Sequence, residues 1–410
     1  MATIKSFKGI RPRKDLADKI AALPYDVYNR EEATKIVKEN PLSFLAIDRA
    51  ETSFSRDVST YDDKVYEKAK ELLNERIQNG CFIEDDSDCL YLYELEMNGR
   101  IQTGIVCLAS VDDYVNNIIK KHENTRADKE QDRIRHVDTC NAQTGPIFLA
   151  YKENSELKTL IQTVKQENCE VSFVSEDNVK HTVYVIKDKD IINRIVSVFD
   201  GIENLYIADG HHRAASAVKT GLMRREKNNN QPGEYDYFLS VLFSDNELNI
   251  MDYNRVVKDL NGLNFDSFMA RIDKVFQQIE ISNKPIKPEH KGQLTMYLNN
   301  NWYRLNIRDE YKNNDPVNGM DVSILQNNIL NPVLGIDDPK TNDRIEFVGG
   351  IRGIDCLMDK CNDLKDAVAF VMYPVSMEEL FNVSDAGLLM PPKSTWFEPK
   401  LRSGLFIHKI

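Results

Sequence analysis

The dipeptide Asn98-Gly99 constrains the fold of this chain more than any other short feature, because it lies between two long β-prone runs. The runs cover residues 90–97 and 101–108 and are mostly apolar. Asn-Gly favours the type I′ turn that joins two adjacent antiparallel strands. We therefore predict a β-hairpin here, so the sheet that contains it cannot be purely parallel.

Helix and strand patterns alternate along the rest of the chain, which predicts an α+β or mixed α/β fold class. A Ser-x-x-Glu capping box at Ser376–Glu379 indicates the start of a further helix. Gly221 is expected to end the helix that begins near His211. Helices are predicted at 30–39, 60–79, 190–199, 211–219 and 265–279, and strands at 182–187, 204–208, 235–243, 293–298, 302–307, 344–348 and 366–373.

The chain length predicts two domains. Its 410 residues exceed the roughly 250–300 residues at which a single hydrophobic core stops growing. We predict a catalytic domain over 1–252 and a second α/β domain over 253–410, whose C-terminal segment closes the site.

Composition excludes several classes of protein. The net charge of −12 argues against a general nucleic-acid binder. No run approaches the roughly 18 apolar residues of a membrane span, and the N-terminal segment lacks the apolar core of a secretory signal. The seven cysteines form no CxxC pair, which favours reduced thiols and a cytoplasmic location.

The segment Leu205–Lys219 carries the strongest chemical pattern. An apolar strand ends at Ala208, Asp209-Gly210 forms a turn, and a helix begins with His211, His212 and Arg213. Free backbone N–H groups at such a helix start form a ready anion site, and the guanidinium of Arg213 can bind two phosphate oxygens. Asp209 stands where a divalent ion or a substrate hydroxyl can be held. The structural alternative is a capped helix with Arg213 paired to a surface acid.

Residues 120–136 form a cationic island in an acidic chain. They include Lys120, Lys121, Arg126, Lys129 and Arg133. A solvated helix with i,i+4 ion pairs explains this pattern equally well. The carboxylate of Glu123, next to His122 at the start of the segment, could act as a general base on a substrate hydroxyl.

The C-terminal stretch Met390–Gly404 combines prolines, aromatic side chains and cations. Lys393, Ser394 and Thr395 form a compact set of anion ligands, and Lys400 and Arg402 add charge. Packing of the tail for stability is an equally good explanation. The pair Gly349-Gly350 could also approach an anion, although a plain turn accounts for it better.

Several of these motifs resemble a known fold family. Asp209–Arg213 with its alanine-rich helix resembles the signature box of the ParB/sulfiredoxin-like fold, and within that fold it is most similar to free serine kinases. Those kinases also carry an upstream His-Glu pair, matched here by His122-Glu123. The whole chain resembles a widespread bacterial family on this fold, through residues 23–27, 122–125, 207–213, 347–350 and 390–397.

The resemblance implies a kinase that phosphorylates free L-serine to O-phospho-L-serine, a reaction that would serve cysteine biosynthesis. Inorganic pyrophosphate is the implied donor and Mg²⁺ the implied cofactor, although archaeal relatives use ADP. Glu123 would be the base, and Asp209 would orient the hydroxyl or hold Mg²⁺. Phosphate would bind Gly210, His211, His212, Arg213, Lys393, Ser394 and Thr395, and the substrate would contact His122, Thr125 and Arg133.

Two alternatives stay open. A non-catalytic regulator could bind a phosphate or nucleotide through the same loop. A ParB-like DNA-associated protein is the weaker alternative, because the residues after 250 predict no helix-turn-helix and the chain is acidic. Sulfiredoxin chemistry is not expected, since no cysteine occurs within 209–213.

Overall fold

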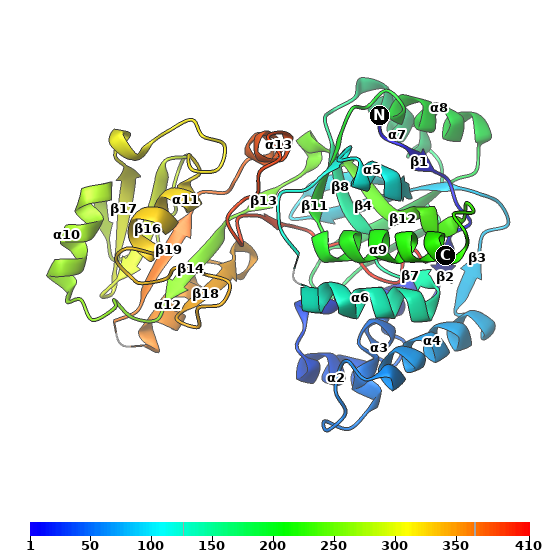
Figure 1. Ribbon diagram of the computed structural model, residues 1–410, viewed down its shortest axis with the longest axis horizontal. Coiled ribbons are helices and arrows are strands. Elements are labelled where there is room, and N and C mark those ends of the chain that lie inside the picture. Colours follow the sequence, from blue (N-terminus) through cyan, green and yellow to red (C-terminus); the bar gives the residue numbers. More distant parts are fainter. Residues whose placement is uncertain (126, 365) are drawn as a thin grey trace. The chain divides into compact units, whose positions relative to one another are not determined.

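The computed structural model describes residues 1–125, 127–364 and 366–410. Arg126 of the cationic island lies outside the described residues. The chain forms two compact units: unit 1 is Met1–Leu248 with Pro399–Ile410, and unit 2 is Asn249–Glu398. Both combine sheets with helices (Figure 1), so the predicted mixed α/β fold class is confirmed.

Unit 1 is built on a sheet in the order β6-β11-β8-β12-β5-β4-β10-β9, with β1 paired to β5. The β6–β11 and β8–β12 pairs are parallel, and the other pairs of this sheet are antiparallel. Its strands are β1 Ile4–Lys5, β4 Leu90–Met97, β5 Arg100–Ser110, β6 Ile119–Lys120, β8 Ile147–Tyr151, β9 Val171–Val174, β10 Lys180–Ile186, β11 Leu205–Asp209 and β12 Tyr237–Ser244. Smaller pairings join β2 Ile10–Pro12 to β3 Phe82–Glu84, and β7 Ala142–Gln143 to β21 His408–Lys409.

The helices of unit 1 contribute to two apolar cores. In the first core, α5, α7, α8 and α9 pack against the large sheet. In the second core, the four helices α1, α2, α3 and α4 pack together with the end of α6 and with Ile407. α6 and α9 pack side by side (Figure 1). The helices are α1 Ala17–Ile20, α2 Arg30–Glu39, α3 Leu45–Asp48, α4 Asp63–Gln78, α5 Val111–Val115, α6 Ala127–Cys140, α7 Ser155–Val164, α8 Lys189–Phe199 and α9 His211–Lys227.

The predicted hairpin is confirmed. β4 and β5 pair antiparallel from Tyr91↔Val106 to Met97↔Arg100. The turn residues Asn98 and Gly99 both have positive φ, 53° and 76°, as a type I′ turn requires. The Asn-Gly pair therefore fixes the register of two central strands.

The prediction that Gly221 ends a helix is wrong, because α9 continues to Lys227. A Cβ at Gly221 would collide with the carbonyl oxygen of Tyr235. The glycine is therefore required for close packing of α9 against the chain that precedes β12, and not for a C-terminal turn.

The C-terminal residues lie in a different unit from the one predicted. Residues 399–410 are predicted to lie in the second domain, whereas they belong to unit 1. Ile407 exchanges backbone hydrogen bonds with Ile10, and β21 pairs with β7. Backbone pairing between distant segments, which no local pattern reveals, holds this segment in place.

Unit 2 contains a sheet in the order β15-β17-β16-β19-β14-β18, and all its neighbouring strands are antiparallel. The second predicted hairpin and the capping box at Ser376 are confirmed. The helix predicted at 265–279 ends at Val275, and 276–279 belong to a strand. The strands are β13 Ile250–Met251, β14 Tyr253–Val257, β15 Phe276–Ser282, β16 Gln293–Leu298, β17 Asn301–Ile307, β18 Ile345–Gly349, β19 Val368–Met372 and β20 Trp396–Phe397, and the helices are α10 Phe265–Val275, α11 Asp321–Leu325, α12 Asp355–Asn362 and α13 Met377–Asp385.

Within the described ranges, no helix combines the length and the apolar composition that crossing a membrane requires.

Gly404 tests how firmly the C-terminal segment is built into unit 1. It has φ of 81°, and a Cβ there would collide with the Phe44 ring. We expect Gly404→Ala to lower the free energy of unfolding by more than about 2 kcal/mol, from strain plus the clash. Gly80→Ala is the matched control, since Gly80 has φ of 71° and open space around it. It should cost about 1 kcal/mol in urea unfolding, and an equal loss in both variants would contradict the packing argument.

Candidate active site

Two parallel strands bring the two strongest sequence motifs to one edge of the large sheet. β6 and β11 pair in parallel, with Lys120 opposite Tyr206. Glu123 and Asp209 each lie three residues beyond this pair. The carboxyl ends of parallel neighbours meet at the same sheet edge, so the segments after the two strands are adjacent.

A ring contact confirms that the two segments meet. His122 and His211 pack edge to face, with ring centroids 4.4 Å apart. Both side chains are buried. Burial lowers the pKa of His122 to about 4, and burial together with His122 holds the pKa of His211 well below its usual value. Both imidazoles are therefore neutral at pH 7 and add no positive charge to the site.

Gly210 forms the turn between β11 and α9. Its φ of 88° is left-handed, a conformation that glycine adopts without strain. The Arg213 guanidinium folds over it, and a Cβ at Gly210 would lie 3.0 Å from Nε and Nη2. The first N–H groups of α9 start directly after this turn and have no carbonyl partner within the helix. Gly210 thus allows the Arg213 guanidinium to lie beside the first N–H groups of α9.

The carboxylate of Asp209 is held between two cations. Arg213 Nη2 donates to Oδ2 at 3.1 Å, and Lys400 Nζ donates to Oδ1 at 3.2 Å. Burial by itself raises the pKa of Asp209, but Lys400 and Arg213 outweigh it and the pKa falls to about 2. Arg213 Nη1 also donates to the Pro146 carbonyl at 2.6 Å. Asp209 is therefore ionised across the physiological range, and it positions both cations.

The same contacts bear on the predicted Mg²⁺ site. Each carboxylate oxygen of Asp209 already contacts a cation. Among the described residues, no group of three or more His, Cys, Asp or Glu side chains has the arrangement of a metal site. Asp209 thus does not fit the role of a resident metal ligand.

Two residues assigned to substrate binding lie near α6: Thr125 precedes the helix, and Arg133 lies within it. The Thr125 hydroxyl donates to Glu130 at 2.8 Å. The Arg133 guanidinium pairs with Asp132 and stacks 4.1 Å from the ring centroid of Tyr25. Arg133 therefore has a carboxylate partner in unit 1.

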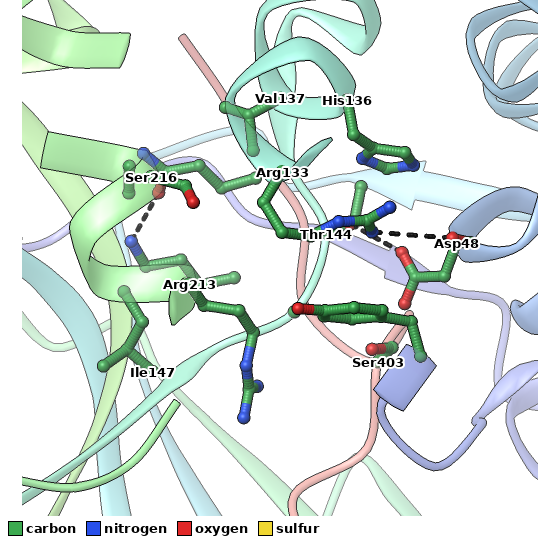
Figure 2. Close-up of a pocket in the computed structure, with 14 residues that line it drawn as sticks. Asp48, Arg133, His136, Val137, Thr144, Ile147, Arg213, Ser216 and Ser403 are labelled. Carbon is green, nitrogen blue, oxygen red and sulfur yellow. Dashed lines mark hydrogen bonds between the residues drawn. The ribbon is translucent and has the colours of Figure 1, made fainter. Parts of the chain in front are cut away.

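Arg133 and Arg213 both line a small cavity (Figure 2). It measures about 30 Å³, which is enough for one or two water molecules. Figure 2 shows Arg133 and Asp48 directed toward each other near Thr144, whose hydroxyl donates to Asp48 at 2.9 Å. Tyr25, Asp48 and Arg133 also line a neighbouring cavity of about 400 Å³. The wall that these side chains form separates a narrow space at α9 from a wider one beside α2 and α4.

The C-terminal cluster lies in unit 2. Ser394 is buried and donates to the Pro391 carbonyl at 2.7 Å, so its hydroxyl is used within the loop. Lys393 Nζ lies 5.7 Å from the ring centroid of Tyr253. The predicted phosphate contacts of Lys393, Ser394 and Thr395 stay predictions.

Comparison with known proteins establishes the family. Residues 4–323 match the family described as "Protein of unknown function (DUF1015)". The chain belongs to the DUF1015 family. A search of curated proteins finds no match to it.

Three solved structures show how far the likeness of this DUF1015 chain extends. C-terminally truncated SbnI from Staphylococcus aureus is 11% identical, covers 74% of this chain and 86% of its own, and gives a TM-score of 0.39. A free serine kinase in complex with AMP is 16% identical, with coverage of 75% and 91% and a TM-score of 0.36. A conserved hypothetical protein from Pyrococcus furiosus is 15% identical, with coverage of 74% and 94% and a TM-score of 0.33. At these scores nothing is transferred from them to this chain.

Sequence patterns did not reveal the role of Lys400 or of the side chains of the cavity wall. The contact of Lys400 with Asp209 spans 191 positions, so the local sequence shows Lys400 only as a charge in the tail. Asp48 lies in α3, where the local sequence shows a short apolar helix and no site pattern. Tyr25 lies within the stretch 23–27 that carries the family resemblance, but nothing in that stretch indicates that the side chain lines a cavity.

Lys400 controls the ionisation of Asp209. We expect Lys400→Met to raise the Asp209 pKa from about 2 toward its ordinary value, because one of two neighbouring cations is lost. NMR titration of the Asp209 carboxyl carbon measures this shift. Lys409→Met is the matched control, since Lys409 lies on the same segment and pairs with Glu84. An unchanged Asp209 titration in Lys400→Met would contradict the assignment.

Proposed function

We propose that this DUF1015 protein transfers a phosphoryl group from inorganic pyrophosphate to the hydroxyl of free L-serine, giving O-phospho-L-serine and phosphate. The observation that carries the proposal is the meeting of the Glu123 segment with the Asp209–Arg213 turn at one sheet edge. The resemblance of these two motifs to free serine kinases names the acceptor. The donor is proposed from the resemblance of the long chain to pyrophosphate-using relatives.

Phosphoryl transfer depends on positioning and charge neutralisation more than on covalent chemistry by the protein. The turn at Gly210 offers the N–H groups of α9, and Arg213 and Lys400 supply positive charge beside it. These groups would receive the oxygens of the transferred phosphoryl group. Neutral His122 and His211 fill the space between the two strand ends and exclude water.

Glu123 is the proposed general base. Its carboxylate accepts the proton of the serine hydroxyl while the serine oxygen forms a bond to phosphorus. The bridging P–O bond of pyrophosphate breaks in the same step, and the departing phosphate keeps the electron pair. Atoms and charge balance without any further reactant.

Mg²⁺ enters this proposal as part of the substrate. Magnesium is commonly bound through one or two carboxylates together with substrate phosphates. Because both oxygens of Asp209 are engaged, we propose that the ion arrives bound to pyrophosphate.

Replacement of Glu123 tests the chemistry. Glu123→Gln keeps the shape of the side chain and removes the base, so turnover should fall by about a hundredfold or more while donor binding is largely kept. Phosphoserine formation measured by ³¹P NMR gives kcat and the donor KM. Glu226→Gln, an exposed acid on α9, is the control and should behave as the wild type. Unchanged turnover in Glu123→Gln would place the base elsewhere.

The donor and the alternatives are tested by one set of incubations. The purified chain is mixed with L-serine, Mg²⁺ and either pyrophosphate, ADP or ATP. Phosphoserine formed with pyrophosphate alone is the expected result. Tight ligand binding without turnover would favour the regulator instead, and salt-sensitive retention of DNA would favour the ParB-like alternative.

A further inference from the structure

Unit 2 contains a buried arginine that has no acidic partner among the described residues. Arg255 lies in the middle of β14 and is only 3% exposed. Its guanidinium donates to the carbonyls of Tyr253 and Lys393, the latter at 3.1 Å, and stacks on Phe347. Burying a charge is costly unless an opposite charge or a full set of hydrogen bonds compensates it.

The other buried arginines in the part of the chain that the structure describes are compensated. Three of them pair with a carboxylate, and Arg76, which lacks one, donates to three carbonyls. Those pairs are Arg11 with Asp85, Arg133 with Asp132, and Arg402 with Asp177. Arg255 has only two carbonyl acceptors, and burial lowers its pKa to about 10. The side chain therefore remains charged at pH 7 without a counter-ion from the described chain.

The carboxylate nearest in sequence does not face Arg255. Asp252 accepts a hydrogen bond from the Asn254 side chain. Side chains alternate between the two faces of a strand, so Asn254 and its partner lie on the face opposite to Arg255. Asp252 is thus committed to the other side of the sheet.

The loop that Arg255 contacts is strained at Lys393. Lys393 has φ of 58°, and the other non-glycine residues of positive φ in the described ranges are all Asn or Asp. Asn and Asp tolerate this conformation through their short polar side chains, whereas for a long side chain such as that of lysine it is unfavourable. Arg255 holds it by binding the Lys393 carbonyl. Strain of this kind, held by surrounding contacts, is concentrated at binding sites and active sites.

We propose that Arg255 and Lys393 form a binding site for a phosphate-type oxyanion in unit 2. The anion supplies the missing counter-charge: the guanidinium binds two oxygens as a fork, and the lysine adds a point charge from the loop. The site stands on these contacts. It does not depend on the proposed function.

The two tryptophans of the chain report on this unit selectively. The sequence contains only Trp302 and Trp396, and both lie in unit 2. Trp396 follows Lys393 by three residues and packs against Tyr253, with ring centroids 5.1 Å apart. The intrinsic tryptophan fluorescence of the protein therefore originates in unit 2.

The experiment titrates the full-length protein with inorganic phosphate, and separately with pyrophosphate, while tryptophan fluorescence and the unfolding temperature are recorded. We expect saturable binding in the wild type. Arg255→Met and Lys393→Ala should each weaken it by about tenfold or more. Arg304→Met is the matched control, because Arg304 lies in the same sheet and pairs with Glu289, and it should bind as the wild type.

Two outcomes would overturn the site. In the first, neither anion changes the tryptophan fluorescence or the unfolding temperature of the wild type. In the second, the wild type and all three variants bind the anion with equal affinity. If Arg255→Met does not fold, Lys393→Ala decides, since the Lys393 side chain is exposed. Tighter binding of pyrophosphate than of phosphate identifies a diphosphate-type ligand of this site, and equal binding identifies a single phosphate-type group. Loss of binding in the two variants of a protein that forms no phosphoserine would retain the site and reject the proposed kinase.

Discussion

The pairing of Asp209 with Arg213 and Lys400 is the interaction on which the candidate site depends, because it joins three separate parts of the chain. Asp209 ends β11, Arg213 lies in the first turn of α9, and Lys400 comes from the C-terminal segment of unit 1. Arg213 also binds the Pro146 carbonyl at the start of β8, so a fourth segment is fixed by the same guanidinium. Position 210 requires a glycine, because its φ is left-handed and a Cβ there would press against the Arg213 guanidinium.

Burial then decides which of the predicted groups carry charge. The resemblance implies that His122 contacts the substrate and that His211 is a phosphate ligand, but these two side chains pack on each other in the interior and are neutral at pH 7. Arg133 is balanced by Asp132. Positive charge at the turn therefore comes from Arg213, Lys400 and the N-terminus of α9, in a chain whose net charge is −12.

Local patterns predicted much of the fold, since turns and periodicity are local properties. The Asn98-Gly99 hairpin, the strand–turn–helix unit predicted at 205–219 and the capping box at Ser376 are examples. Gly221 was misread because its reason is a contact with Tyr235, which periodicity does not contain. For the same reason the return of residues 399–410 to unit 1 and the Lys400–Asp209 contact were not predicted, since both depend on residues far apart in sequence. The lack of an acidic partner for Arg255 among the described residues is likewise a property of the folded chain and not of a local pattern.

The net charge at the Asp209–Arg213 turn limits how much of the negative charge of pyrophosphate the turn can neutralise. Two cations and one carboxylate leave a single net positive charge, to which the helix N-terminus adds about one half. A phosphoryl group carries about −1.5 to −2 at pH 7, and pyrophosphate contains two of them. The turn alone therefore neutralises no more than one end of pyrophosphate. Because Asp209 is committed to its cations, the remaining positive charge has to come from a counter-ion that the donor brings or from cationic side chains outside the turn.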